Sequence, residues 1–275
     1  MSSTAVSNPN KALWETGDFS EIAAFMRHSG EAIVESLGIT PGQRVLDLGS
    51  GDGTTALPTA RLGADVTGID ISSRMVAAGN RRAAQAGLTR LRFQEGDACN
   101  LEGVADRSFD LLISIFGAMF GPRPFDAARE MVRVTKPGGR VVMGNWIPND
   151  PTFISQLLKV SSAFTPPPPE GFISPMLWGV ESQIAERFGQ AGIPADRIQM
   201  TRDTWYFAHP EKTPEQFNEL FEAYYAPTMK AVEAARSNGR EGELHTQLVE
   251  LANAQNKSEA GTLIPATFLR VTVTV

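Results

Sequence analysis

The stretch that most constrains the fold is a run of glycines at every second position, Gly49, Gly51 and Gly53. The apolar residues before it are typical of a buried strand, and a helical pattern begins directly after it. Glycine permits positive φ and lets a ligand approach the main chain closely. A strand, a glycine turn and a helix N-terminus together predict a nucleotide-type binding edge with exposed N–H groups.

Two kinds of ligand fit this edge. Gly51, Gly53 and Ala56 match the dinucleotide-binding pattern, which with Asp70 would make the chain an NAD(P)-dependent oxidoreductase. The longer run from Asp47 to Gly53 adds a carboxylate at the end of the strand. A carboxylate favours a ligand that carries ammonium and sulfonium charges and repels a pyrophosphate. S-adenosylmethionine is therefore favoured over NAD, and the chain also lacks a recognisable hydride-transfer constellation.

Two further carboxylates end the next two predicted strands, Asp70 and Asp97. Ligands of open α/β sheets bind beyond the carboxyl ends of the strands. We expect Asp70 to accept hydrogen bonds from both ribose hydroxyls and Asp97 to accept one from the adenine amine. Each acid also has a purely structural explanation, Asp70 as the N-cap of the next helix and Asp97 as the cap of a turn.

Bulk properties bound the function. The 275 residues are 42% apolar and 20% charged, as in an ordinary globular protein. The net charge of −6, without a long basic run, argues against a nucleic-acid partner. The single cysteine, Cys99, excludes an intrachain disulfide. The apolar segment 111–119 is too short to span a membrane, and no signal peptide is recognisable, so we expect a cytoplasmic protein.

Strands alternate with helices over most of the chain, which predicts an α/β fold with a parallel sheet and right-handed crossovers. The predicted strands are 45–48, 65–70, 91–95, 109–116, 140–146, 198–207 and 267–275. The predicted helices are 18–37, capped by Asp18 and Glu21, then 54–62, 72–87, 125–134, 181–191, 213–236 with a break near Pro227, and 243–254.

Prolines preclude regular structure over much of 147–177. We interpret this segment as a rigid lid over a pocket; a partner-binding motif is the alternative. The chain is predicted to be one domain, 1–275, with a core of about 38–147 and 192–275. The helix 18–37 and the lid or insert segments 148–180 and 213–256 would cover the substrate pocket.

From Arg44 to Trp146 the chain resembles the Rossmann-like (class I) S-adenosylmethionine-dependent methyltransferases. The motif Val-Leu-Asp-Leu-Gly-Ser-Gly-Asp-Gly resembles motif I, Val-Thr-Gly-Ile-Asp-Ile-Ser the acidic ribose motif and Gly-Asp-Ala the adenine motif. The branch most similar to it is that of bacterial small-molecule enzymes related to the ubiquinone/menaquinone methyltransferases. The resemblance implies a seven-stranded, mostly parallel sheet with an antiparallel last strand and helices on both faces. It also implies S-adenosylmethionine as cofactor and S-adenosylhomocysteine as product.

The cofactor-binding residues follow from the motifs and the resemblance together. The resemblance places Ser114 near the methionine moiety, and Ile71 and Ala98 beside the adenine. The full expected set is Asp47, Gly49, Ser50, Gly51, Gly53, Asp70, Ile71, Asp97, Ala98 and Ser114. No metal site is expected.

The acceptor is expected to be a small molecule, partly apolar or aromatic. The stretch from Ser114 to Gly117 lacks the Asn/Asp-Pro-Pro-Tyr motif that base-amine methyltransferases carry there. The pocket candidates are Phe116, Met119, Phe120, Trp146, Phe164, Phe172, Trp178, Tyr224 and Tyr225, although aromatic residues at helical spacing are usually core.

The sequence does not assign a catalytic residue. The candidates are His28, Tyr206 and Tyr224, with Asp18, His209 and His245 no stronger. The methylated atom (O, C or N) and the oligomeric state, a homodimer included, stay open. A non-catalytic regulator that binds S-adenosylmethionine is a further alternative, since binding and turnover are separate properties.

Overall fold

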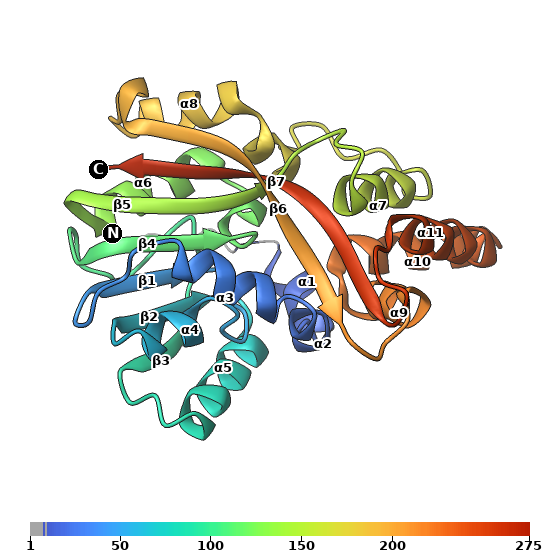
Figure 1. Cartoon of the computed structure of the whole chain (residues 1–275). Helices are drawn as coiled ribbons and strands as arrows, with labels where there is room; N and C mark the ends of the chain where they lie inside the picture. The colour runs from blue at the N-terminus through green and yellow to red at the C-terminus, as the bar shows by residue number, and fades with distance from the viewer. Residues whose placement is uncertain (1–7, 9) are drawn as a thin grey trace.

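Seven strands form one sheet in the computed structural model, which describes residues 8 and 10–275. Their order across the sheet is β3-β2-β1-β4-β5-β7-β6, and β7 runs antiparallel to both of its neighbours while β1 to β5 are parallel (Figure 1). This confirms the predicted sheet with its antiparallel last strand. The strands are β1 (Arg44–Leu48), β2 (Asp65–Asp70), β3 (Leu91–Glu95), β4 (Phe109–Ile115), β5 (Thr135–Trp146), β6 (Ile198–His209) and β7 (Thr262–Thr274).

Helices cover both faces of the sheet because the central strands are apolar on both faces. In β1, Val45 packs into the core cluster that contains Ala56 and Ala83 of α4 and α5. Leu46, the next residue, packs on the opposite face into the cluster that contains Met131 of α6. The helices of this core are α4 (Ala56–Arg61), α5 (Ser73–Gln85), α6 (Pro124–Val134) and α8 (Glu181–Gln190).

A helical cap lies at the edge of the sheet where β6 ends and β7 begins (Figure 1). Its helices are α7 (Phe153–Ser162), α9 (Pro214–Tyr224), α10 (Ala226–Ser237) and α11 (Glu241–Gln255). The predicted capping box at the start of α9 is confirmed, with Thr213 and Gln216 bonding reciprocally. The predicted break near Pro227 is also confirmed, since α10 begins one residue before that proline.

The single helix predicted over 18–37 is wrong. The chain instead forms α2 (Ser20–Ala24) and α3 (Arg27–Glu35) after a first helix, α1 (Lys11–Thr16). The break falls at Phe25, whose carbonyl accepts the N–H of Ala208 in β6 at 2.9 Å. Ser29 continues this pairing, because its Oγ accepts from Tyr206 N and donates to Tyr206 O. The segment thus forms hydrogen bonds with backbone groups of β6, which is an edge strand. The helix is interrupted where the Phe25 carbonyl turns to β6.

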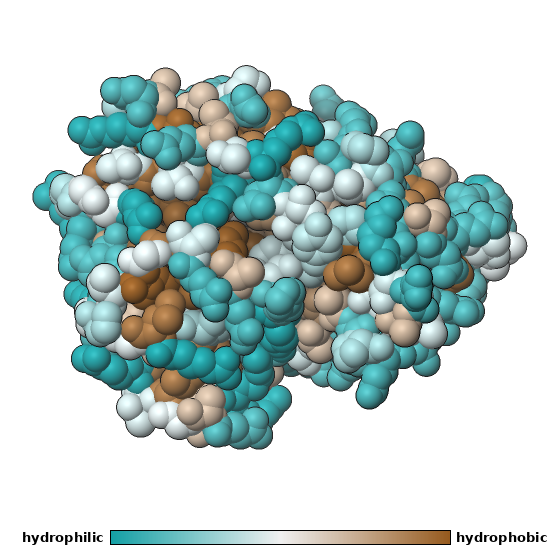
Figure 2. Space-filling view, viewed as in Figure 1, coloured by the Kyte–Doolittle hydropathy of each residue, from teal (hydrophilic) through white to brown (hydrophobic). Residues whose placement is uncertain are grey.

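The proline-rich segment is more regular than the sequence predicted. α7 occupies Phe153–Ser162, between Pro151 and the proline run at 166–169, and a 3₁₀ helix follows at Pro175–Gly179. Proline is tolerated in the first turn of a helix and disrupts mainly the interior, and 152–165 contains none. No helix in the described part of the chain has the length and apolar character needed to cross a membrane. The face in Figure 2 is largely hydrophilic, with hydrophobic residues in small groups.

Candidate cofactor and acceptor site

The glycine run forms a turn that only glycine can make. Gly49 and Gly51 have φ of 71° and 52°. A Cβ at Gly49 would lie 2.5 Å from the Cα of Gly117, so the two loops that follow β1 and β4 touch main chain to main chain. A Cβ at Gly51 would meet no atom within 4 Å, because Gly51 borders an open cavity. The turn therefore presents bare backbone to a ligand, as a nucleotide-type site requires.

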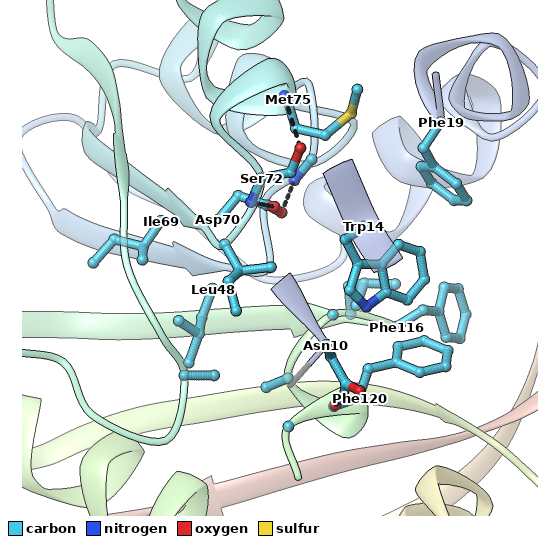
Figure 3. A pocket seen from close by; sticks show the side chains of 18 of the residues that line it. Asn10, Trp14, Phe19, Leu48, Ile69, Asp70, Ser72, Met75, Phe116 and Phe120 are labelled. Atoms are coloured by element: carbon cyan, nitrogen blue, oxygen red, sulfur yellow. Dashed lines mark hydrogen bonds between the residues drawn. The ribbon is translucent and has the colours of Figure 1, made fainter. Parts of the chain in front are cut away.

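Asp70 connects this turn to the start of α5. Its Oδ2 accepts from Gly51 N at 2.8 Å, and its Oδ1 accepts from Ser72 N at 2.9 Å. Ser72 in turn accepts from Met75 N and is the N-cap of α5, as Figure 3 shows. Desolvation raises the pKa of Asp70 against the opposing effect of these N–H donors. Asp70 borders the cavity, and a carboxylate has lone pairs to spare for ribose hydroxyls.

Asp97 lies beside the same cavity, after β3. Its Oδ1 accepts from Cys99 N at 2.9 Å and from Asn8 Nδ2 at 3.0 Å. Its Oδ2 forms an ion pair with Nη2 of Arg123 at 3.6 Å. Ile71 and Ala98 line the cavity next to the two acids. The structure thus brings together six of the expected cofactor residues around one cavity: Gly49, Gly51, Asp70, Ile71, Asp97 and Ala98.

The other four expected residues, Asp47, Ser50, Gly53 and Ser114, are not among those that line the cavity. Asp47 is buried and accepts from Thr55 Oγ1 at 2.6 Å, and burial raises its pKa to about 7. Ser114 is also buried; its Oγ donates to Leu48 O and accepts from Ala118 N. Through these hydrogen bonds Asp47 and Ser114 support the loops that follow β1 and β4 from the buried side. That Ser114 lies near the methionine moiety stays a prediction; its hydroxyl is already hydrogen-bonded to the backbone on both sides.

The cavity continues from the glycine turn into an apolar region. Its lining runs from Gly49 and Gly51 at the turn to Phe207 of β6 and Phe221 of α9, so the sheet and the helical cap border one space. Of the predicted aromatic pocket, Phe116, Phe120, Trp146 and Tyr225 line it. Phe116, in the left-handed region at φ 58°, stacks on Trp146 with centroids 3.6 Å apart.

The remaining predicted pocket residues are not part of the cavity lining. Phe172 is 55% exposed, Phe164, Trp178 and Met119 are buried in the core, and Tyr224 packs against that core. Sequence analysis missed four aromatic residues that do line the cavity, Trp14, Phe19, Phe207 and Phe221. Figure 3 shows Trp14, Phe19 and Phe120 side by side at the cavity. Phe207 could have been predicted, because it ends the predicted strand 198–207 and ligands of such sheets bind at strand ends.

None of the catalytic candidates borders the cavity. His28 on α3 is exposed, Tyr206 is 39% exposed on β6, and Tyr224 is half-buried at the end of α9. Asp18, His209 and His245 are likewise absent from the lining. Within residues 8 and 10–275, no group of three or more His, Cys, Asp or Glu side chains is arranged to hold a metal ion.

Comparisons with known proteins place this geometry in context. A family model described as "Methyltransferase domain" matches residues 46–143. An uncharacterized protein of Mycobacterium tuberculosis is 33% identical over 245 residues, which cover 88% of this chain and 86% of the relative. The demethylmenaquinone methyltransferase of Renibacterium salmoninarum is 41% identical over 121 residues, 44% of this chain and 48% of that protein.

A solved structure shares the fold. Phosphoethanolamine N-methyltransferase 2 of Haemonchus contortus, in complex with phosphomonomethylethanolamine and S-adenosylhomocysteine, matches with a TM-score of 0.56 at 20% identity. The match covers 90% of this chain and 52% of that one.

Proposed function

The chain belongs to the Rossmann-like, class I S-adenosylmethionine-dependent methyltransferases, and from this premise we propose that it methylates a small molecule held in the apolar part of the cavity. The observation that carries the proposal is the continuity of the cavity. The glycine turn and two carboxylates border one part, and aromatic side chains border the rest. Two ligands would therefore meet in one enclosure.

The residues present fit the cofactor. The open space beside Gly51 admits a ligand to the bare backbone, and Asp70 and Asp97 stand at consecutive strand ends, where ribose and adenine would lie. When bound, S-adenosylmethionine supplies an electrophilic methyl group on a sulfonium. We assign the ribose to Asp70, the adenine to Asp97 with Ile71 and Ala98, and a supporting role behind the turn to Asp47, Ser50, Gly53 and Ser114.

The protein's contribution to the reaction is alignment and exclusion of water. Phe116 and Trp146 stack on each other and both line the cavity, so an acceptor there can pack against aromatic surface. Holding two reactants in line can supply up to roughly 7–11 kcal/mol of the barrier reduction. Aromatic faces also stabilise a neighbouring cation such as a sulfonium. The relative named demethylmenaquinone methyltransferase supports an acceptor with apolar character.

A calorimetric titration tests the cofactor assignment. Wild-type protein should bind S-adenosylmethionine and S-adenosylhomocysteine, and Asp70→Asn should weaken both by about 10- to 100-fold, because an acceptor of charge-assisted hydrogen bonds is lost. Asp65→Asn is the matched control, since Asp65 begins the same strand and pairs with Arg90 on the surface. Its affinity should equal that of wild type.

Turnover separates an enzyme from a binder. Methyl-labelled S-adenosylmethionine, incubated with the protein and a panel of small aromatic acceptors, should yield labelled product. Cofactor binding without transfer to any acceptor would favour a non-catalytic regulator. Binding of NADH in place of the sulfur ligands would contradict the proposal.

A further inference from the structure

Tyr225 occupies a special place in the cavity wall, at the break between α9 and α10. Tyr225 lines the cavity, and the residue is 4% exposed. The ring of Phe221 lies 5.2 Å from it and that of Trp14 lies 6.5 Å away, so helices far apart in the sequence meet around it. Its aromatic neighbours Trp14, Phe19 and Phe221 also line the cavity, so Tyr225 belongs to the apolar part.

The hydroxyl of Tyr225 is buried and has no hydrogen-bond partner among residues 8 and 10–275. Leaving a buried hydroxyl unpaired is unfavourable, because the group loses its hydrogen bonds to water, so most such groups in native proteins find a partner. The indole N–H groups of Trp178 and Trp205 are also unpaired, but neither residue borders the cavity. Tyr225 is the case in which a ligand could bring the missing partner.

Burial also raises the pKa of Tyr225, so its phenol stays protonated at neutral pH and can donate a hydrogen bond. For the same reason Tyr225 is not a general base. In the described part of the chain, the cavity lining contains no Lys, Arg or His, and its only charged side chains are Asp70 and Asp97 at the cofactor end. An acceptor carrying a carboxylate or phosphate would lie there without a cation, which is unfavourable in an apolar site.

We propose that Tyr225 donates a hydrogen bond to the methyl acceptor and selects an uncharged, flat, largely apolar molecule that carries an oxygen or nitrogen able to accept it. The inference rests on the proposed function and names the substrate class of the same site. Phe116 and Trp146 contribute aromatic surface to the lining, and Tyr225 provides the polar anchor. Asn8, Asn10 and Ser72 also line the cavity, but their side chains already hydrogen-bond within the protein. The acceptor atom must be nucleophilic without help from a side-chain base at this end of the cavity.

The test uses three probes of the same two-ring skeleton: 2-naphthol, which has a hydroxyl; naphthalene, which has none; and 2-naphthoate, which is anionic at neutral pH. Their affinities are measured by equilibrium dialysis with the full chain saturated with S-adenosylhomocysteine. We expect 2-naphthol to bind more tightly than naphthalene, and 2-naphthoate to bind at least 10-fold more weakly than 2-naphthol.

Tyr225→Phe removes the anchor and keeps the ring. It should weaken 2-naphthol by about 5- to 50-fold, leave naphthalene unchanged or tighter, and leave the affinity for S-adenosylhomocysteine unchanged. Tyr224→Phe is the matched control, because Tyr224 is the adjacent residue, is half-buried and does not border the cavity. It should change none of these affinities.

Several results would overturn the inference. Equal losses for 2-naphthol and naphthalene in Tyr225→Phe would mean that Tyr225 only packs. An unchanged affinity for 2-naphthol in that variant, equal binding of 2-naphthoate, or failure of all three probes to bind would equally refute it. If S-adenosylhomocysteine itself does not bind the wild-type protein, the proposed function fails first, and this outcome is distinguished by its own titration.

Discussion

At the scale of single residues, Asp47 and Asp70 show how two carboxylates of one sequence motif separate into different roles. Asp70 borders the cavity and bonds two backbone N–H groups of the turn. Asp47 is buried behind the turn, where Thr55 donates to it. The sequence pattern alone does not distinguish them, because it does not give the register of β1 against β2. In the sheet Asp47 pairs with Gly68, so Asp70 lies two residues further toward the carboxyl edge and reaches the cavity.

The burial of Asp47 makes a pH prediction. Its pKa of about 7 in the folded protein lies above the usual value near 3.8, so the folded state retains a proton that the unfolded chain loses. The contribution of Asp47 to the free energy of unfolding is therefore at its maximum below about pH 4, and it is lost as the pH rises through about 7. We expect wild-type protein to lose about 2 kcal/mol of unfolding free energy from this group between pH 5.5 and 8.

Asp47→Asn should remove this dependence, because an amide keeps an oxygen for Thr55 and does not ionise. Urea denaturation of cofactor-free protein at the two pH values measures the effect as the difference between wild type and variant. A variant whose stability changes with pH as steeply as that of wild type would refute the assignment.

At the scale of elements, an ionic triad of Arg27, Asp52 and Arg82 holds the glycine turn against two helices. Arg27 of α3 bonds both oxygens of Asp52, a buried residue of the turn, and also Thr54. Arg82 of α5 donates to the backbone oxygen of Asp52 and lies 3.3 Å from its carboxylate. Two helices from different parts of the chain thus fix the loop that the cofactor is proposed to contact.

Arg27→Met should destabilise the protein by about 1–3 kcal/mol and weaken S-adenosylhomocysteine binding, since it leaves Asp52 with one cation and frees the turn. Arg61→Met is the control, because Arg61 joins α4 to Glu31 of α3 through an ion pair whose partners are about half exposed. Such exposed pairs contribute little. Thermal melts and a ligand titration on both variants measure the contrast; equal effects would argue against this role of the ionic triad.

The elements that the sequence predicted are those with local causes. The Thr213 capping box and the strand–turn–helix around Gly49 depend on residues a few positions apart. The break at Phe25 was missed because its cause is distant: the N–H of Ala208 takes the Phe25 carbonyl. The helix α7 was missed because nearby prolines outweighed the apolar spacing of Phe153, Ile154 and Leu157.

At the scale of the whole molecule, three parts of the chain build the cavity wall. Trp14 comes from α1, Gly51 from the sheet's central turn, and Phe221 from the helical cap. The lining around the glycine turn could be predicted because a single motif carries it. The acceptor part could not, because its wall forms only when the first helix and the cap fold onto the sheet, and no sequence spacing records that meeting.

Both proposed ligands share one chamber, which has consequences for turnover. The demethylated cofactor and the methylated product must leave before the next cycle, and a fresh acceptor can enter while the spent cofactor is still in place. The resulting dead-end complex predicts that the steady-state rate falls at high acceptor concentration. Raising S-adenosylhomocysteine should deepen that inhibition, and initial-rate measurements over both concentrations would show a rate that simply saturates if product and cofactor depart independently.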